Sequence, residues 1–201
     1  MGKLIVFEGI DGTGKTTISS LLVTELKNRG INAVRYEDIE NRNSVFNAAK
    51  EYIKAHATVE ASFFFYVASA LNKSAEITPL LTDAWVICDR YVYSTVAQHI
   101  ARGLDAALVP DFKKTALRKP DYLFLLTVDE AVRISRLSLR GEASADDFVP
   151  KEVGSVPYIK EQTFMSFSPH VLDNSTDGPG LLIESICSII LESSTSSDSL
   201  S

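Results

Sequence analysis

The chain has 201 residues, of which 45% are hydrophobic and 23% are charged, and its formal net charge is −6. This length suits one compact α/β domain with a full core. The acidic balance argues against a general duplex-binding surface, although it leaves room for a local basic pocket that binds a small anion. No apolar run approaches the about 20 residues that span a bilayer, and the N-terminus lacks the zones of a signal peptide. We therefore expect a cytoplasmic protein without membrane or nucleic-acid partners.

Strands and helices alternate along the chain, which predicts parallel strands joined by helical crossovers. The run 3–9 (KLIVFEG) is short, apolar and β-branched, as in a first strand. Leucines at helical spacing then predict a helix over about 15–29, which stops at Gly30. The further predicted strands are 31–37, 84–89, 121–129 and 170–173, and the further predicted helices are 44–55, 59–81, 94–102, one between Pro110 and Pro120, 130–140, 158–167 and 180–192.

Two segments differ from this pattern. The stretch 141–156 is polar and acidic and has no period, which predicts a mobile loop. The Ser-rich end, 193–201, has too little apolar content to order. The sequence thus predicts a single domain over 1–192 followed by a disordered tail.

Residues 9–16 match the pattern G-x-x-x-x-G-K-[ST] without a gap, between a predicted strand and a predicted helix. Glycines bring bare N–H groups up to phosphate oxygens, and the helix N-terminus adds partial positive charge. Lys15 would supply a cation to the β- and γ-phosphates, and the Thr16 hydroxyl would bind Mg²⁺. The predicted ATP-binding residues are Gly9, Ile10, Asp11, Gly12, Thr13, Gly14, Lys15, Thr16 and Thr17.

A second element ends the predicted strand 84–89. Asp89 stands at the carboxyl end of that strand, where open α/β sheets gather their ligands, and it is our second predicted metal-side residue beside Thr16. Arg90 follows at once and could neutralise charge on a transferring phosphoryl group.

With these residues in place, the sequence resembles the thymidylate kinase family. The resemblance rests on FEGIDGTGKTT, FFFYVAS…ITPLL, CDRYVYSTVAQ and KPDYLFLLTVDEAVRISRLSLRG, in order and spacing over about the first 140 residues. It implies a three-layer α/β fold of the phosphate-loop NTP hydrolase type, with a five-stranded parallel sheet, flanking helices and a lid loop at about 141–156. It also implies a homodimer that uses ATP and Mg²⁺ to phosphorylate a nucleoside monophosphate.

The resemblance assigns roles residue by residue. Lys15 and Thr16 would hold ATP and Mg²⁺, while Asp89 would be the acid on the metal side. Asp11 would lie near the acceptor sugar and phosphate, and Arg90 would grip the acceptor phosphate. The implied contacts to the acceptor base are a stacking ring at Phe65 and small polar side chains at Ser94 and Thr95.

The lid is implied to carry a catalytic cation. Some members have an arginine directly after the loop carboxylate, whereas this chain has Gly12, and members with glycine there use a lid arginine. Arg136 and Arg140 lie one helical turn apart and lead into the predicted lid, so they are the candidate catalytic cations. Cations are also favourable at a helix C-terminus without any catalytic role.

The acceptor side departs from the family pattern, which leaves the acceptor open. Ser69 stands where an arginine usually reads a thymine carbonyl, and Gln98 where a tyrosine usually crowds out a ribose 2′-hydroxyl. RYEDIENRN lacks the usual arginine near a Pro-Gly pair, for which Arg35 or Arg42 could substitute. His99 could contact the base or act as a general base, but a place on the polar helix surface is the expectation. Two alternatives therefore stay open, namely a kinase on the same scaffold with a different acceptor and an ATP-binding protein without catalysis.

Overall fold

The computed structural model describes residues 2–39, 45–140, 148–175 and 178–192. Within this part of the chain, strands form one sheet in the order β2-β3-β1-β4-β5, and all neighbours pair in parallel. Because parallel strands point the same way, all their carboxyl ends lie at one edge of the sheet. The strands are β1 (Leu4–Glu8), β2 (Ala33–Arg35), β3 (Trp85–Asp89), β4 (Tyr122–Thr127) and β5 (His170–Asp173).

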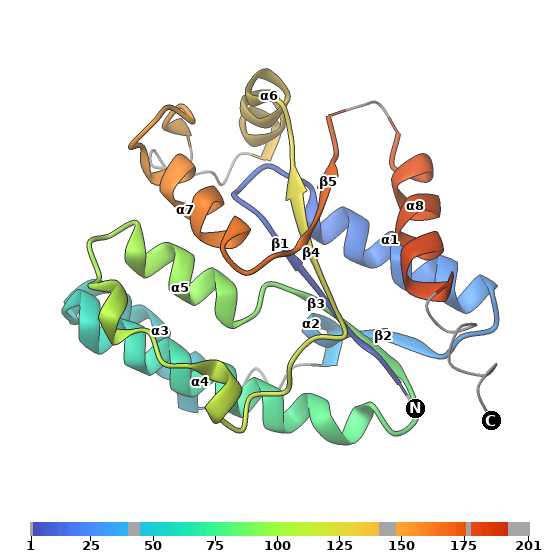
Figure 1. The fold of residues 1–201 in the computed structure, drawn as a ribbon, viewed down its shortest axis with the longest axis horizontal. Helices are drawn as coiled ribbons and strands as arrows, with labels where there is room; N and C mark the ends of the chain where they lie inside the picture. The colour runs from blue at the N-terminus through green and yellow to red at the C-terminus, as the bar shows by residue number, and fades with distance from the viewer. Residues whose placement is uncertain (1, 40–44, 141–147, 176–177, 193–201) are drawn as a thin grey trace.

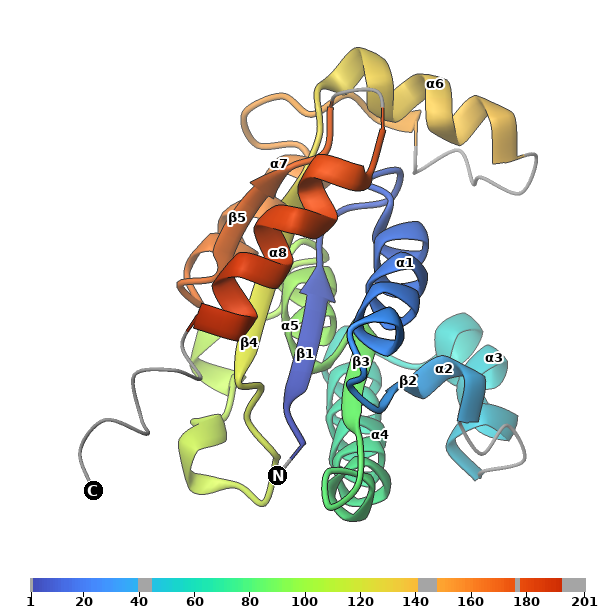
Figure 2. The same ribbon diagram turned by 90° about the vertical axis from the view of Figure 1, so that its right-hand side faces the viewer.

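Helices cover both faces of this sheet, as expected for the three-layer fold (Figure 1). α1 and α8 lie on one face, and α4 and α5 lie on the other. Figure 2 shows α6 at the end of the molecule where the strands finish, and α2 and α3 beside β2. The helices are α1 (Lys15–Asn28), α2 (Tyr36–Ile39), α3 (Val45–His56), α4 (Val59–Leu80), α5 (Val92–Ile100), α6 (Glu130–Arg140), α7 (Val156–Met165) and α8 (Gly180–Glu192).

The central strand β1 shows why the sheet needs helices on both faces. Ile5 and Phe7 point into the core beneath α1 and α8, whereas Leu4 and Val6 point into the core beneath α4. All four side chains have no exposed surface. Alternate residues of a strand face opposite sides, so a run that is apolar throughout predicts burial on both faces.

The prediction of a helix between Pro110 and Pro120 is wrong, because this segment forms no α-helix. The structure has two short 3₁₀ turns, Ala106–Leu108 and Phe112–Lys114. The Asp111 side chain accepts from the Lys113 N–H and closes a single turn, after which the chain becomes extended. Leu117 then reaches the core beneath α4, so a tertiary contact overrides the helix pattern.

Other element boundaries differ by smaller amounts. β2 has three residues rather than seven, because the chain turns into α2 at Tyr36. α5 begins at Val92, two residues earlier than expected. Residues 141–147 of the predicted lid and the whole predicted tail lie outside the described residues. No described helix is both long and apolar enough to cross a membrane.

Candidate active site

The phosphate loop lies between β1 and α1, with its glycines packed against other elements. Gly14 caps α1 in a left-handed conformation, with φ 89°. A Cβ on Gly14 would lie 2.5 Å from Asn174 Nδ2, and one on Gly12 (φ 90°) would lie 2.8 Å from Cγ of Arg133. Only glycine combines these backbone angles with such close approaches. The loop is therefore fixed by tertiary contacts as well as by its own sequence.

Lys15 is buried at the start of α1 and bonds to its own loop. Its ammonium donates to the Ile10 carbonyl at 2.8 Å and lies 3.4 Å from the Thr13 hydroxyl. Burial, with a smaller contribution from the nearby guanidinium of Arg90, lowers the pKa of this lysine to about 7. A phosphate anion would provide the negative charge that stabilises the protonated form.

Thr16 and Asp89 meet at the carboxyl end of β3. The Thr16 hydroxyl donates to Asp89 Oδ2 at 2.5 Å, while Asp89 Oδ1 is buried without a hydrogen-bond partner among the described residues. An orphaned carboxylate oxygen beside a hydroxyl suits a hard cation that prefers oxygen ligands. The described residues hold no cluster of three or more His, Cys, Asp or Glu side chains for a metal. Thr16 and Asp89 together offer the one or two protein oxygens that Mg²⁺ uses beside phosphates and water.

Arg90 turns its guanidinium toward the phosphate loop. It pairs with the carboxylate of Asp11 and donates to the Gly9 carbonyl and to Ser94 Oγ, both at 3.3 Å. Lys160, from α7, approaches the other carboxylate oxygen of Asp11 at 3.7 Å. The sequence-predicted residues Asp11, Arg90 and Ser94 are thus brought together at one place.

Glu8 is a buried residue of the site and was not predicted from the sequence. Its carboxylate is 1% exposed and accepts from the N–H groups of Tyr91 and Ser94 at 2.8 and 3.1 Å, and from the Ser94 hydroxyl. It caps α5, whose own N-cap residue, Tyr91, makes no side-chain capping bond. Burial raises the pKa of Glu8, which the Ser94 hydroxyl and the positive charge of Arg90 partly offset. A glutamate that ends an apolar strand directly before the loop was the available signal.

The larger cavity, about 870 Å³, lies on the Asp11 side of the phosphate loop and is called the acceptor cleft below. Its lining contains all but one of the predicted acceptor residues, namely Ser69, Arg90, Ser94, Thr95 and Gln98.

Phe65 is the exception among these residues. It does not line the acceptor cleft and instead packs on Phe46, with ring centroids 5.7 Å apart. Its neighbour Tyr66 lines the cleft. The stacking role of Phe65 stays a prediction.

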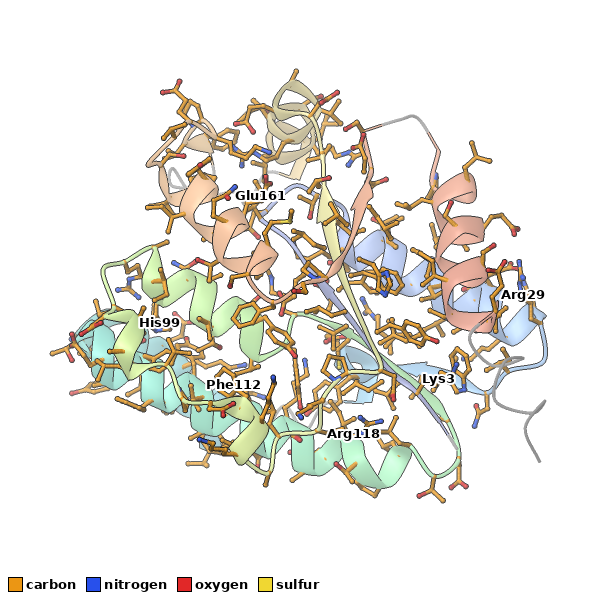
Figure 3. The ribbon with its side chains drawn as sticks, viewed as in Figure 1. Lys3, Arg29, His99, Phe112, Arg118 and Glu161 are labelled. Carbon is orange, nitrogen blue, oxygen red and sulfur yellow. The ribbon has the colours of Figure 1, made fainter. Side chains whose placement is uncertain are left out.

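His99 differs from its expected place on the polar helix surface, because it is 2% exposed. It lies between α5 and α4 (Figure 3), where Nδ1 lies 2.7 Å from the Thr95 carbonyl and Nε2 lies 3.1 Å from Ser62 Oγ. Burial lowers its pKa, so the ring is neutral at pH 7. Nδ1 then donates to the carbonyl and Nε2 accepts from Ser62. Because both ring nitrogens are satisfied inside the protein, burial is tolerated.

A smaller cavity, about 280 Å³, lies on the opposite side of the loop and is called the donor cavity below. Gly12, Gly14 and Thr17 line it together with Arg136 and Asn174. Nη2 of Arg136 donates to the Asn174 carbonyl at 2.9 Å, and Nη1 is buried without a partner in the described part of the chain. Arg136 therefore faces the donor cavity. Its catalytic role stays a prediction.

The remaining site candidates have different outcomes. The side chain of Arg140 lies outside the described residues, as do Arg42 and residues 141–147 of the predicted lid. Arg35 is described but does not line the acceptor cleft. Asn174, which donates to the Thr13 carbonyl at 2.8 Å, carried no sequence signal because its role depends on β5 ending beside the loop.

Comparison with known proteins gives consistent results. The family model described as thymidylate kinase matches residues 7–155. The thymidylate kinase of Brachyspira hyodysenteriae is 29% identical over 197 residues, which cover 94% of this chain and 92% of that protein. The probable thymidylate kinase of Methanocaldococcus jannaschii is 32% identical over 150 residues, or 73% of this chain and 76% of that protein.

Solved structures show the same fold. The thymidylate kinase of Candida albicans, with 20% sequence identity, aligns at a TM-score of 0.66 over 96% of this chain and 92% of its own. The enzyme of Ehrlichia chaffeensis, with 21% identity, aligns at a TM-score of 0.65 over 94% of this chain and 98% of its own.

Proposed function

This chain belongs to the thymidylate kinase family, and from that premise we propose that it transfers the γ-phosphate of ATP to thymidine 5′-monophosphate (TMP), with Mg²⁺ held at Thr16 and Asp89. The observation that carries the proposal is the placement of the phosphate loop between two cavities. Ile10 and Asp11 line the acceptor cleft, whereas Gly12 and Gly14 line the donor cavity. A nucleotide in each cavity would therefore bring its phosphates to the same loop.

The chemistry needs positioning and charge neutralisation. An acceptor phosphate oxygen bonds to the γ-phosphorus, and the bond from that phosphorus to the bridging β–γ oxygen breaks, so ADP leaves with the electron pair. Lys15 and the loop N–H groups stabilise the donor phosphates, and Arg90 stabilises the acceptor side. Bound Mg²⁺ would neutralise charge on the β- and γ-phosphates.

The test is an assay coupled to ADP release over a panel of nucleoside monophosphates, nucleosides and small metabolites. We expect TMP to be the best acceptor. Lys15→Ala and Arg90→Ala should each lower kcat/KM by roughly 100-fold or more, because each removes charge stabilisation at the transferred group. Arg29→Ala is the control, since Arg29 pairs with Glu25 and Glu184 far from the loop (Figure 3). Near-normal turnover in either active-site variant, or no phosphorylated acceptor at high enzyme concentration, would refute the proposal.

Two further expectations stay predictions. The resemblance implies a homodimer, which sedimentation velocity can test. A cytoplasmic location is expected from the sequence, and cell fractionation can test it.

A further inference from the structure

The backbone of Arg90 adopts a conformation that needs support. Its φ is 72°, in the left-handed region that non-glycine residues rarely adopt. Such a residue persists only when its surroundings fix it, and strain of this kind gathers at active sites. The Arg90 N–H donates to the Phe7 carbonyl at 3.0 Å, and the Arg90 carbonyl accepts from Lys73 Nζ, also at 3.0 Å. A cation from α4 thus holds the main chain of the acceptor-side arginine.

Lys73 is itself held by its neighbours. Its ammonium lies 3.1 Å from Glu37 Oε1, and the same oxygen accepts from the Asp89 N–H at 3.1 Å. Its ammonium also lies 4.6 Å from the centroid of the Tyr36 ring. Contacts from α2 and from the residue after β3 therefore fix the position of the Lys73 ammonium, and β3 in turn holds Glu37. This order reduces the entropy that a ligand must remove on binding.

Lys73 also reaches the ligand space. Its side chain is 20% exposed, and it lines the acceptor cleft together with Asp89 and Arg90. A phosphate monoester at pH 7 carries nearly two negative charges, and the guanidinium of Arg90 is already paired with Asp11. A second cation beside Arg90 is what such a group requires. An ammonium has three donors in a tetrahedral arrangement and can bind a phosphate as a point charge.

We propose that Lys73 binds the acceptor phosphate and that Glu37 positions it beside Arg90. Lys73 would then supply the positive charge for which the sequence offered Arg35 or Arg42 as candidates. This inference rests on the proposed function, because it concerns the phosphate of the same acceptor. It assigns Lys73 to a direct contact with the acceptor and Glu37 to a positioning role.

The experiment compares a nucleotide with its nucleoside. Dissociation constants for TMP and for thymidine are measured by calorimetry with the wild-type protein and with Lys73→Met. We expect the variant to bind TMP roughly 10- to 100-fold more weakly, as for loss of a charged hydrogen bond, and to bind thymidine nearly as well as before. Lys73→Arg should restore most of the TMP affinity. The KM for ATP should stay within about twofold, because Lys73 does not line the donor cavity.

A matched control separates phosphate binding from support of the fold. Lys3 donates to the Ile190 carbonyl at 2.9 Å and lies 4.9 Å from the Trp85 ring, so its setting resembles that of Lys73 at a site outside the cleft. Lys3→Met should leave the ratio of TMP to thymidine affinity unchanged. Lys73→Met could fail to fold because Glu37 loses its partner. In that case the same affinities are measured with the double variant Lys73→Met/Glu37→Gln, which lacks the uncompensated charge.

The outcomes distinguish the two proposals. An unchanged TMP-to-thymidine ratio in the Lys73 variants would overturn this inference, even when the wild-type protein phosphorylates TMP. Absence of TMP turnover by the wild-type protein would instead contradict the proposed function. The ratio would then be measured with the nucleotide and nucleoside pair that the acceptor panel identifies.

Discussion

Lys15 carries its charge in a buried position. The loop offers it one carbonyl and one hydroxyl, while burial favours its neutral form and lowers its pKa from 10.5 to about 7. Because the unfolded chain binds this proton more tightly, the free energy of unfolding that this group contributes rises with pH between about 7 and 10.5. A bound polyphosphate would stabilise the ammonium and so raise the pKa of Lys15 again.

We therefore predict that ATP binding is accompanied by proton uptake at pH 8. Calorimetry in two buffers with different ionisation enthalpies should give about 0.5–1 proton taken up per nucleotide, because the pKa of Lys15 rises toward its ordinary value. The contribution from Lys15 should vanish near pH 6, where the lysine is already protonated. No uptake at pH 8, or a net release, would contradict this account of Lys15.

At the scale of elements, Glu8 joins the end of β1 to the start of α5. It takes the place of an N-cap for that helix, since the Tyr91 side chain makes no capping bond. Ser94 Oγ in turn accepts from Arg90, so the position of the acceptor-side guanidinium depends on this link.

We predict that Glu8→Ala lowers the free energy of unfolding by roughly 2–4 kcal/mol, because it leaves two N–H groups and a hydroxyl without their buried acceptor. It should also raise the KM for the acceptor. Glu8→Gln, which keeps one acceptor oxygen, should lose less. Urea unfolding measures the stabilities, and a loss below about 0.5 kcal/mol in Glu8→Ala would show that water replaces the carboxylate.

Elements also show how far sequence reasoning reaches. The strands and the phosphate loop could be predicted, because burial on both faces and a contiguous motif leave local patterns. The segment 110–120 could not, because its two prolines suit a helix and an isolated turn equally well, and only the contact of Leu117 decides between them. The positions of Glu8 and Lys73 in the site could not be predicted for a similar reason, because their hydrogen-bond partners are distant in the chain.

At the scale of the whole molecule, ligand binding should stabilise the fold, because both cavities share one loop that belongs to the central strand and the first helix. ATP with Mg²⁺ at about 100 times its dissociation constant adds about 2.7 kcal/mol to the free energy of unfolding. For a domain of this size, this raises Tm by roughly 5–10 °C. Lys15→Met should lose most of this shift. If neither ATP nor ADP changed the Tm of the wild-type protein, nucleotide binding would be contradicted altogether.

The contact between Gly12 and Arg133 restricts how this protein can change over time. A side chain at position 12 would press on the aliphatic part of Arg133, which is 1% exposed and held by Glu130 and by the Val149 carbonyl. A Cβ there would also lie 3.1 Å from the Arg133 carbonyl oxygen, and the φ of 90° would strain any side chain. A smaller residue at position 133 would therefore not be enough to admit one, and position 12 is held to glycine by the backbone of α6 as well as by a side chain.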